Sequence, residues 1–351
     1  MSTHFSVSDL AFDEDTLSRK TSVRVGTSGD VKFQTPLKAG LGGVTEIPFY
    51  EAHKRITSET INKCLKSEEK DREQGRDLKS RCKGNFNVLT LEYTSKNDVP
   101  TDRMVVAMSD MQYNNTDAIT TPSWFDLITR KNHVDVLQYV ALSKIFLEAA
   151  SMRNHKPILG TIPQSIPPEE LEKVIKFYID HDVTSFVVDS HGRTLISGSW
   201  IRAFQRSLCE YNIEKECVLY TINAFQGIIP KTKTATEAKD FIGFTAGFDI
   251  IGGKHSNKYF ESNGEVAQSV GRIFNRDTYN YEKQVCNKEE KKLIDERSIR
   301  EQNAEFETVR EAISEKSLKP LLTTKDLAKE TMNIIRSFKD RGHTMKIDNF
   351  I

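Results

Sequence analysis

Hydrophobic and polar positions follow a regular order between residues 156 and 192. An apolar run at 157–162 is followed by apolar positions at helical spacing over 171–179, and a second apolar run at 184–188 stops at Asp189. Apolar residues three and four positions apart indicate a helix, whereas short continuous apolar runs are typical of buried parallel strands. The pattern therefore predicts strand, helix and strand in about 37 residues, which is the length of a βαβ unit.

The same alternation continues on both sides of this unit. Further strands are predicted at 22–25, 31–33, 86–93, 104–108, 217–222 and 248–251, and helices at 134–150, 200–211 and 236–246. Strands that alternate with helices favour a parallel sheet. Because no glycine-rich phosphate-binding fingerprint follows a strand, we expect a closed (β/α)8 barrel of the TIM type rather than an open doubly wound sheet.

Three other segments differ in composition from this central region. Residues 1–20 are polar and acidic, and we expect them to form a flexible arm. Residues 51–83 are strongly charged and predict a solvated helix with a surface loop, the alternative being a basic contact for phosphate. Residues 285–351 are rich in Lys and Glu and predict two or three helices. The chain is therefore divided into the arm, a barrel domain at 21–284 with N-terminal strands, and a C-terminal helical segment.

Charge and cysteine content restrict the class of protein. Lys plus Arg and Asp plus Glu both number 50, so the net charge is zero and the overall basic field of many nucleic-acid binders is missing, although local basic patches remain possible. The five cysteines are widely scattered without zinc-ligand or redox spacing, which favours reduced thiols in the cytoplasm. The N-terminal residues do not resemble a signal or transit peptide, and no apolar run is long enough to span a membrane.

Polar residues stand where the predicted strands end, and these are the candidates for chemistry. They are Asp110, Gln164, Asp189, the loop 223–227, Asp249, Lys254 and His255. Active sites of barrels are built at the C-terminal ends of the strands. A carboxylate there can act as a nucleophile or general base, and a glutamine side chain can both donate to and accept from a purine edge. The alternative role for each aspartate is capping or turn formation. The eight histidines lack metal-ligating spacing, so no catalytic metal is expected.

Four short pieces carry a resemblance to a known family. They are MVVAMSDMQ with Asp110, ILGTIPQS with Gln164, GFDII with Asp249, and Gln302-Asn303 followed by EFETVREAISEKSLKPLL. In these pieces, which lie within residues 100–322, the chain resembles the tRNA-guanine transglycosylase superfamily, especially its archaeal and DNA-modifying branches. The resemblance implies a barrel enzyme that exchanges guanine in tRNA or DNA for a 7-deazaguanine base.

The resemblance also suggests roles for the candidate residues. Asp249 would be the nucleophile, Asp110 would handle the proton of the base, and Asp110 and Gln164 would read the base. Asp189, Gly227 and His255 would line the substrate pocket. Five basic residues near the proposed mouth would meet phosphate: Lys231, Lys233, Lys254, Lys258 and Arg272.

The chain departs from the family pattern at two places. The family's nucleophilic aspartate is expected three residues after Asp249, where this chain has Gly252, so either Asp249 takes the role or the nucleophile is absent. The family's zinc ligands are expected near Tyr279, Tyr281, Gln284 and Gln302, and these residue types predict that no zinc cofactor is bound.

Three hypotheses for function follow from these observations. The first is an enzyme that acts on nucleic acid by base exchange. The second is a catalytically degenerate paralogue that holds nucleic acid or pairs with an active subunit. For the assembly of the chain, a homodimer and a heterodimer are the two alternatives. The third is an unrelated barrel enzyme with a small-molecule substrate.

Overall fold

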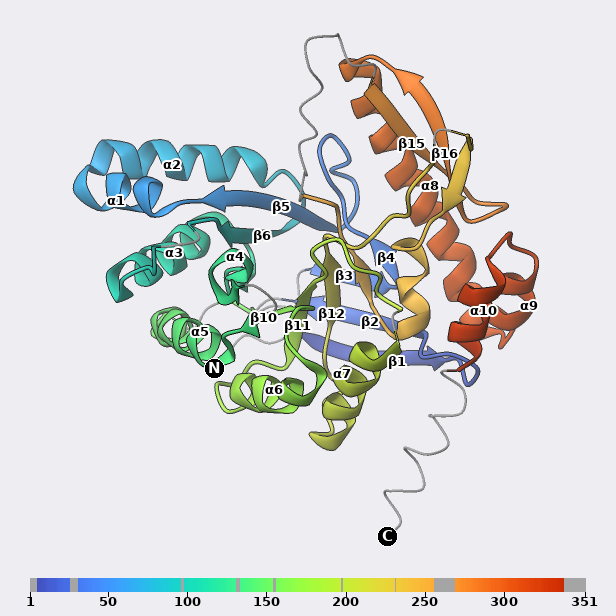
Figure 1. The fold of residues 1–351 in the computed structure, drawn as a ribbon, viewed down its shortest axis with the longest axis horizontal. Coiled ribbons are helices and arrows are strands. Elements are labelled where there is room, and N and C mark those ends of the chain that lie inside the picture. The colour runs from blue at the N-terminus through green and yellow to red at the C-terminus, as the bar shows by residue number, and fades with distance from the viewer. Residues whose placement is uncertain are drawn as a thin grey trace.

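The computed structural model describes residues 5–25, 31–95, 98–130, 133–153, 156–196, 198–230, 232–255 and 269–337. The fold is mixed α/β, and a parallel sheet of six strands lies at its centre (Figure 1). In spatial order these strands are β4 (Leu37–Lys38), β14 (Ile250–Ile251), β12 (Leu219–Ile222), β11 (Ser185–Asp189), β10 (Ile158–Pro163) and β7 (Ile119–Thr120). Every neighbouring pair in this sheet is parallel.

A second parallel pair adjoins both edges of the central sheet. It consists of β5 (Phe49–Ile56) and β6 (Phe86–Tyr93), which pair along eight residues each. One parallel bridge joins Gly40, just after β4, to Tyr50 of β5. Two more join β6 to the segments that flank β7, from Val88 to Ala118 and from Glu92 to Ser123. The two sheets are thus linked on both sides.

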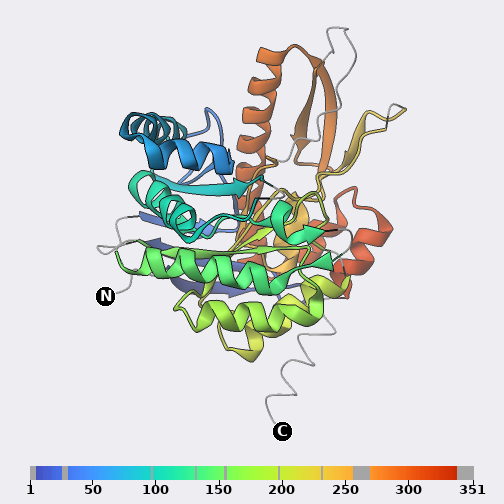
Figure 2. The ribbon, with the colours of Figure 1, turned by 60° about the vertical axis from the view of Figure 1, so that its left-hand side comes forward.

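Helices follow most of these strands and pack against their outer side (Figures 1 and 2). They are α1 (Ser58–Lys66), α2 (Glu68–Arg81), α3 (Asp102–Asn115), α4 (Phe125–Ile128), α5 (Val136–Ser151), α6 (Leu171–Ile179) and α7 (Gly198–Glu210). Short 3-10 helices cover Pro168–Glu170 and Phe241–Ala246, and β8 (Thr129–Arg130) pairs with β9 (His133–Val134). None of the described helices has the length and apolarity that a bilayer crossing requires.

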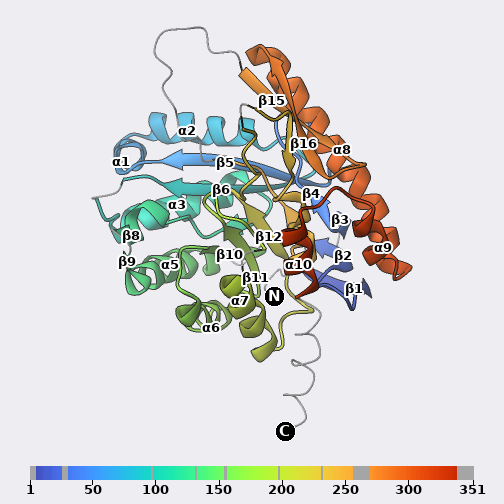
Figure 3. The ribbon, with the colours of Figure 1, turned by 45° about the vertical axis from the view of Figure 1, so that its right-hand side comes forward.

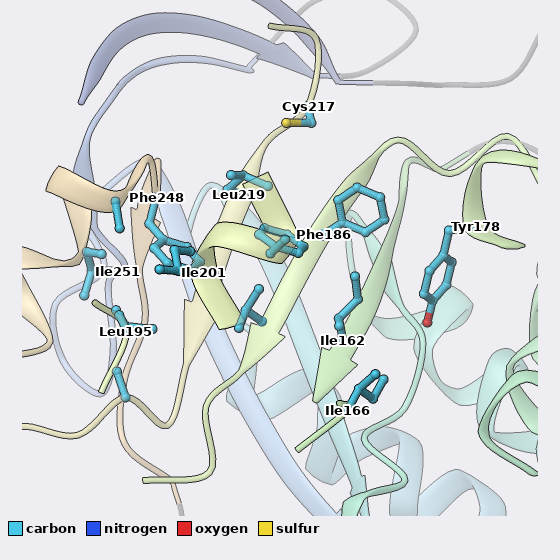
Figure 4. Close-up of a cluster of buried hydrophobic side chains, with 14 of the residues drawn as sticks. Ile162, Ile166, Tyr178, Phe186, Leu195, Ile201, Cys217, Leu219, Phe248 and Ile251 are labelled. Carbon is cyan, nitrogen blue, oxygen red and sulfur yellow. The ribbon is translucent and has the colours of Figure 1, made fainter. Parts of the chain in front are cut away.

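The strands carry buried apolar side chains on both faces, and each face belongs to a separate core. The first core fills the layer between strands and helices, where Ile162, Phe186 and Leu219 of the strands pack with Tyr178 of α6 and Ile201 of α7 (Figure 4). The second core lies on the other face of the strands. It includes Phe33, Leu37, Phe49, Phe86, Val88, Ala118, Leu159, Val187, Val218, Tyr220 and Ile250. Two-sided burial of this kind is what the apolar runs at 157–162 and 184–188 predict.

A three-stranded antiparallel sheet at the N-terminus contributes to the second core. It consists of β1 (Ser6–Phe12), β2 (Arg19–Val25) and β3 (Val31–Thr35) in that order. The predicted flexible arm at 1–20 is therefore wrong from Ser6 onwards. Its polar residues alternate with positions that face the core, and Val7 packs against the second core while Ser6 is exposed.

The C-terminal part has a hairpin before its helices. Strands β15 (Ser269–Asn275) and β16 (Asn280–Cys286) form an antiparallel sheet with β13 (Ala235–Glu237). Helix α8 (Lys288–Ser314) lies along this hairpin and extends beyond the central strands (Figures 1 and 3). Helices α9 (Leu318–Thr323) and α10 (Lys329–Arg336) follow it, as predicted for the C-terminal segment. The helix predicted at 236–246 is wrong, because that stretch begins in β13 and continues as a 3-10 helix.

Two other predictions are corrected by the structure. The strand predicted at 104–108 lies inside α3, because Met104, Val105, Met108 and Met111 are buried at helical spacing. The segment 51–83 begins in the strand β5, and the solvated helix predicted there is confirmed beyond it by α1 and α2. The strands predicted at 86–93 and 184–188 and the helix at 134–150 are confirmed to within a few residues.

Candidate functional site

A cluster of polar side chains lies where the parallel strands end. Strand β5 contributes Glu51 and His53, strand β6 contributes Glu92, and His255 follows β14 in the chain. Side chains two apart in a strand share a face, so Glu51 and His53 point to the same side as Phe49, which belongs to the second core. The cluster is therefore continuous with this core.

Glu51 is buried and fully hydrogen-bonded. Its carboxylate accepts hydrogen bonds from His255 Nε2 and from the Tyr220 hydroxyl, and from the Gly253 N–H at 3.0 Å. Burial raises the pKa of a carboxyl group, but the three donors outweigh this effect and lower the pKa of Glu51 below its usual value. Glu51 is therefore held in its ionised form.

A second carboxylate and histidine pair lies directly beside the first. His53 stacks on His255 with ring centroids 4.3 Å apart and an angle of 9° between the planes. Its Nε2 is 3.2 Å from Glu92 Oε2, which also accepts from Arg55 Nε at 2.9 Å. Burial raises the pKa of Glu92, but these two donors reverse the effect and bring the pKa to about 2.

The surroundings of His53 lower its pKa. Burial is the largest cause, and the neighbouring ring of His255 lowers the pKa of His53 further. The cluster thus combines two carboxylates, at Glu51 and Glu92, with a stacked pair of imidazoles.

Asp189 joins this cluster through an asparagine. Its carboxylate accepts from Ser123 Oγ at 2.7 Å and from Asn223 Nδ2 at 3.0 Å, and Asn223 Oδ1 accepts from the backbone N–H of His255 at 2.7 Å. Asn223 and His191 have φ values of 57° and 45°, which non-glycine residues seldom adopt. Unfavourable backbone of this kind occurs often at functional sites, where surrounding contacts maintain it.

Several residues predicted from the sequence do meet at this end of the strands. The backbone N–H of Gln164 donates to the Asp189 carbonyl at 2.9 Å, and its side chain donates to the Thr194 carbonyl at 2.9 Å. Asp189 is connected through Asn223 to His255, and Lys254 borders the same cavity as His255. The structure therefore brings together Gln164, Asp189 and His255.

Asp249 lies at the other end of the strands, immediately before β14. Arg19 of β2 donates to it through Nη2 at 2.5 Å and Nε at 3.0 Å. Thr35 Oγ1 donates at 3.0 Å and the Leu219 N–H at 2.8 Å. The side chain of Asp249 has no exposed surface. This position gives Asp249 a buried ion pair that fastens the N-terminal sheet, in place of the open carboxylate expected for a nucleophile.

Asp110 and Gly227 also lie apart from the cluster. Asp110 is on α3, where its side chain is 43% exposed and forms an ion pair with Arg153, so it does not stand at a strand end as predicted. Gly227 has a φ of 84°, and its carbonyl accepts from Arg272 at 2.9 Å beside the β13 sheet. Two of the predicted phosphate contacts, Lys231 and Lys258, lie outside the described residues.

A cavity of about 650 Å³ opens beside the cluster. Glu51, His53 and His255 form one part of its wall. The charged residues of the remaining wall are Asp77, Arg81, Lys83, Lys254, Lys288, Lys291, Lys292, Asp295 and Glu296. Its volume is within the range of ordinary ligand sites, which is about 300–1,000 Å³.

Three of the residues at the expected zinc positions form hydrogen bonds with other side chains. The Tyr281 hydroxyl donates to Asp240 at 2.8 Å and lies 3.5 Å from Gln302 Oε1, and Lys38 Nζ is 3.5 Å from Asp240. Tyr279 instead donates to Glu305 at 2.8 Å. Across the described ranges, no group of three or more His, Cys, Asp or Glu side chains is placed to hold a metal ion.

Comparison with known proteins adds no relative to this description. No protein-family model matches the chain, and no curated protein matches it. The transglycosylase resemblance therefore depends on the four sequence pieces alone.

Sequence reasoning missed Glu51, His53 and Glu92. The first two were hidden in a segment assigned to a charged helix, although Phe49, Glu51 and His53 alternate with the buried Tyr50 and Ala52 as in a strand. Glu92 stands one residue before the end of a strand that was predicted correctly. A carboxylate near a predicted strand end is the same signal that selected Asp189.

Proposed function

We propose that the chain is a base-exchange glycosyltransferase that acts on nucleic acid, with Glu51 as its carboxylate nucleophile. One observation carries the proposal. A Cβ atom added at Gly252 would overlap Glu51 Oε2 and come within 2.8 Å of Tyr220 Cε2. Glu51 therefore fills the space into which a side chain at 252 would project, and 252 is the position where the family resemblance expects the nucleophile. A carboxylate from β5 substitutes in space for the aspartate missing after β14.

This proposal includes a closed barrel of eight parallel strands. The three isolated bridges support it, because strand pairing can be followed from β4 through β5, β6, β7, β10, β11 and β12 to β14 and back to β4. The second core supports it as well, since it contains residues of seven of these strands and Ala118, which immediately precedes β7. In such a barrel the cluster lies at the C-terminal mouth, where barrel enzymes place their active sites.

The chemistry needs a nucleophile and a carrier for one proton. A Glu51 oxygen attacks C1′ of a guanosine, the C1′–N9 bond breaks, and guanine leaves with the bonding electrons and takes up a proton. The N–H nitrogen of an incoming 7-deazaguanine then attacks C1′, loses its proton and releases the Glu51 carboxylate. The proton gained by the first base equals the proton lost by the second, so one carrier serves both steps.

The histidine pair is suited to carry that proton. His53 and His255 are stacked beside the nucleophile, and each is hydrogen-bonded to a carboxylate. A base within this site would need to leave its stack in the nucleic acid, at a cost of a few kcal/mol. The five free cysteines suit a reducing compartment such as the cytoplasm, where tRNA is modified.

A second candidate function is binding without catalysis. Its support is the low exposure of Glu51, which is 2% accessible and engaged by three donors. A nucleophile in this state must release at least one hydrogen bond before it attacks. In a binding protein the same bonds would serve only to hold β5 against β12 and the loop after β14.

Label exchange separates the two candidates. The full chain is incubated with tRNA or guanine-containing DNA and with radiolabelled guanine or 7-deazaguanine, and acid-precipitable label is counted. We expect incorporation by the wild type and a loss of at least about 1,000-fold in Glu51→Gln, which corresponds to about 4 kcal/mol of barrier. Glu59→Gln is the matched control, because Glu59 is exposed on α1 and pairs only with Lys63.

A denaturing gel tests the intermediate directly. A covalent protein–nucleic acid adduct is expected when the wild type is denatured during turnover, and Glu51→Gln is expected to form none. If Glu51→Gln still incorporates label, Glu51 is not the nucleophile. If the wild type binds nucleic acid but incorporates nothing, the binding function replaces the enzymatic one.

A further inference from the structure

The cavity beside the cluster has a predominantly basic wall in a chain with no net charge. Six Lys and Arg side chains line it, from α2, the segment after α2, the segment after β14 and the first turn of α8. Three acidic side chains other than Glu51 line the same wall: Asp77, Asp295 and Glu296. A local excess of positive charge attracts polyanions even when the whole molecule is neutral.

Ion pairs neutralise part of this wall and leave the rest positive. Arg81 pairs with Asp77 at 3.1 Å. Lys291 pairs with Asp295 at 2.5 Å and Lys292 with Glu296 at 3.8 Å. Within the described residues, Lys83 and Lys288 have no carboxylate partner, and both side chains are exposed. The cations without a carboxylate partner thus come from two separate parts of the wall, the segment after α2 and the start of α8.

We propose that this cavity binds the phosphodiester backbone of a nucleic acid next to the nucleotide that enters the Glu51 site. The inference rests on the proposed function and adds the location and chemistry of substrate binding. Lys83, Lys254 and Lys288 contact the phosphates, and the neighbouring wall formed by His53 and His255 receives the target nucleotide. Lysine serves as a point charge for phosphate, and each neutralised phosphate releases condensed counterions.

The composition of the wall favours this occupant over a peptide or a lipid. Among the described residues, the apolar side chains of the wall are those of Leu41, Tyr50, Ala52 and Ile299. Tyr50 is buried, with its hydroxyl donating to the Gly42 carbonyl at 2.8 Å. Protein interfaces and lipid sites depend on apolar area, whereas nucleic-acid backbones are held by charge. The basic segment at 51–83, for which a phosphate contact was the alternative interpretation, supplies Arg81 and Lys83.

Fluorescence anisotropy of a labelled single-stranded oligonucleotide tests the inference. The full chain carrying Glu51→Gln is used, so that binding is measured without turnover. We compare Lys83→Glu/Lys288→Glu with Lys144→Glu/Lys173→Glu, a control on α5 and α6 that makes the same change in net charge at exposed positions. Lys83→Glu/Lys288→Glu is expected to bind at least about tenfold more weakly. The slope of log K against log salt concentration is expected to fall in magnitude by about two, one for each phosphate contact removed.

Three further arms identify the ligand. RNA and DNA of one sequence show which polymer is preferred, and a methylphosphonate oligonucleotide, which lacks backbone charge, is expected to bind at least about tenfold more weakly than either. The inference would be overturned if Lys83→Glu/Lys288→Glu and Lys144→Glu/Lys173→Glu lost equal affinity, or if the chain with Glu51→Gln alone did not bind. If Lys83→Glu/Lys288→Glu loses its near-ultraviolet circular dichroism, Lys83→Ala/Lys288→Ala is measured in its place with the same criteria.

The outcome is separable from that of the proposed function. Salt-dependent binding through Lys83 and Lys288 without label exchange would support the cavity as the backbone-binding site and contradict the enzymatic proposal. Label exchange that is unaffected by Lys83→Glu/Lys288→Glu would support the enzymatic proposal and contradict backbone binding in the cavity.

Discussion

Asp249 and Glu51 are both buried carboxylates next to β14, yet their surroundings differ. Asp249 precedes the strand and is held by Arg19, Thr35 and a backbone N–H. Glu51 contacts the residues after the strand, and its partners are the buried Tyr220, and His255, which lines a cavity together with Glu51. Burial alone therefore does not identify a candidate site, whereas titratable partners beside a cavity do.

The largest expected effect is on stability at the Asp249 end. Arg19→Met removes the only cation paired with Asp249 among the described residues and leaves a buried charge unpaired. Loss of one partner of a buried ion pair costs about 3–5 kcal/mol. Urea unfolding measures this cost. Arg19→Met/Asp249→Leu is expected to recover a large part of it, and a single variant that loses less than about 1 kcal/mol would show that the pair is not structural.

The second effect is the dependence of stability on pH at the Glu51 end. The pKa of Glu92 is about 2 in the folded chain, below its unfolded value of about 4.3. The stabilisation that ionised Glu92 gives to the folded chain is therefore complete above about pH 4.3 and is lost as the pH falls towards 2. After allowance for the partly exposed Arg55, it amounts to about 2–3 kcal/mol.

The measurement is urea unfolding of the wild type and Glu92→Gln between pH 5 and pH 2.5. The variant is expected to lose less stability over this interval, because its amide does not titrate. His53 acts in the same direction at higher pH, since its lowered pKa favours the neutral form and stability falls as the pH drops below about 6.5. Parallel curves of unfolding free energy against pH for the wild type and Glu92→Gln would contradict the lowered pKa of Glu92.

A smaller effect is expected from Gly252→Ala. The new methyl group would overlap Glu51 Oε2 and the Thr221 carbonyl, and overpacking of this kind costs about 1–2 kcal/mol. Glu51→Ala in the same chain removes the overlap with Glu51, so the pair is expected to be non-additive by at least about 0.5 kcal/mol. Thermal or urea unfolding of the wild type, the two single variants and the double variant gives this coupling energy. Strict additivity would show that Glu51 and a side chain at position 252 do not compete for the same space.

The smallest effect is expected at Asp110. Its ion pair with Arg153 is about two-fifths exposed, and exposed pairs contribute less than about 1 kcal/mol. Asp110→Ala should therefore change the unfolding free energy by under about 0.5 kcal/mol. A loss of several kcal/mol would mean that α3 depends on this residue in a way its contacts do not explain.

Much of the fold could be predicted because apolar runs mark it directly. The unit β10, α6 and β11 was predicted to within a few residues, since proline marks the helix start and the strands are uniformly apolar. Residues 104–108 were assigned wrongly because a run of five apolar residues fits a strand and a helix equally well. Strand β5 was missed because its polar residues resemble those of a solvated helix, although Glu51 and His53 face the cavity.

The site was predictable only in part, because its contacts join distant residues. Asp189 and His255 stand at strand ends and could be selected by position. Glu51 is 204 residues from His255 in the chain, and no local pattern indicates that the two meet. Asp249 could be selected by position too, but its partner Arg19 is 230 residues away in a segment expected to be a loose arm.

The N-terminal sheet has a practical consequence for work with this chain. The first twenty residues of the chain have the composition of a dispensable tail, and proteins are commonly shortened at such places before expression. Here, removal of β1 and the start of β2 would strip Phe5 and Val7 from the second core and leave Asp249 without Arg19. A shortened protein would therefore expose apolar surface at one end of the strands and is expected to aggregate, even though the Glu51 end would be untouched by the cut.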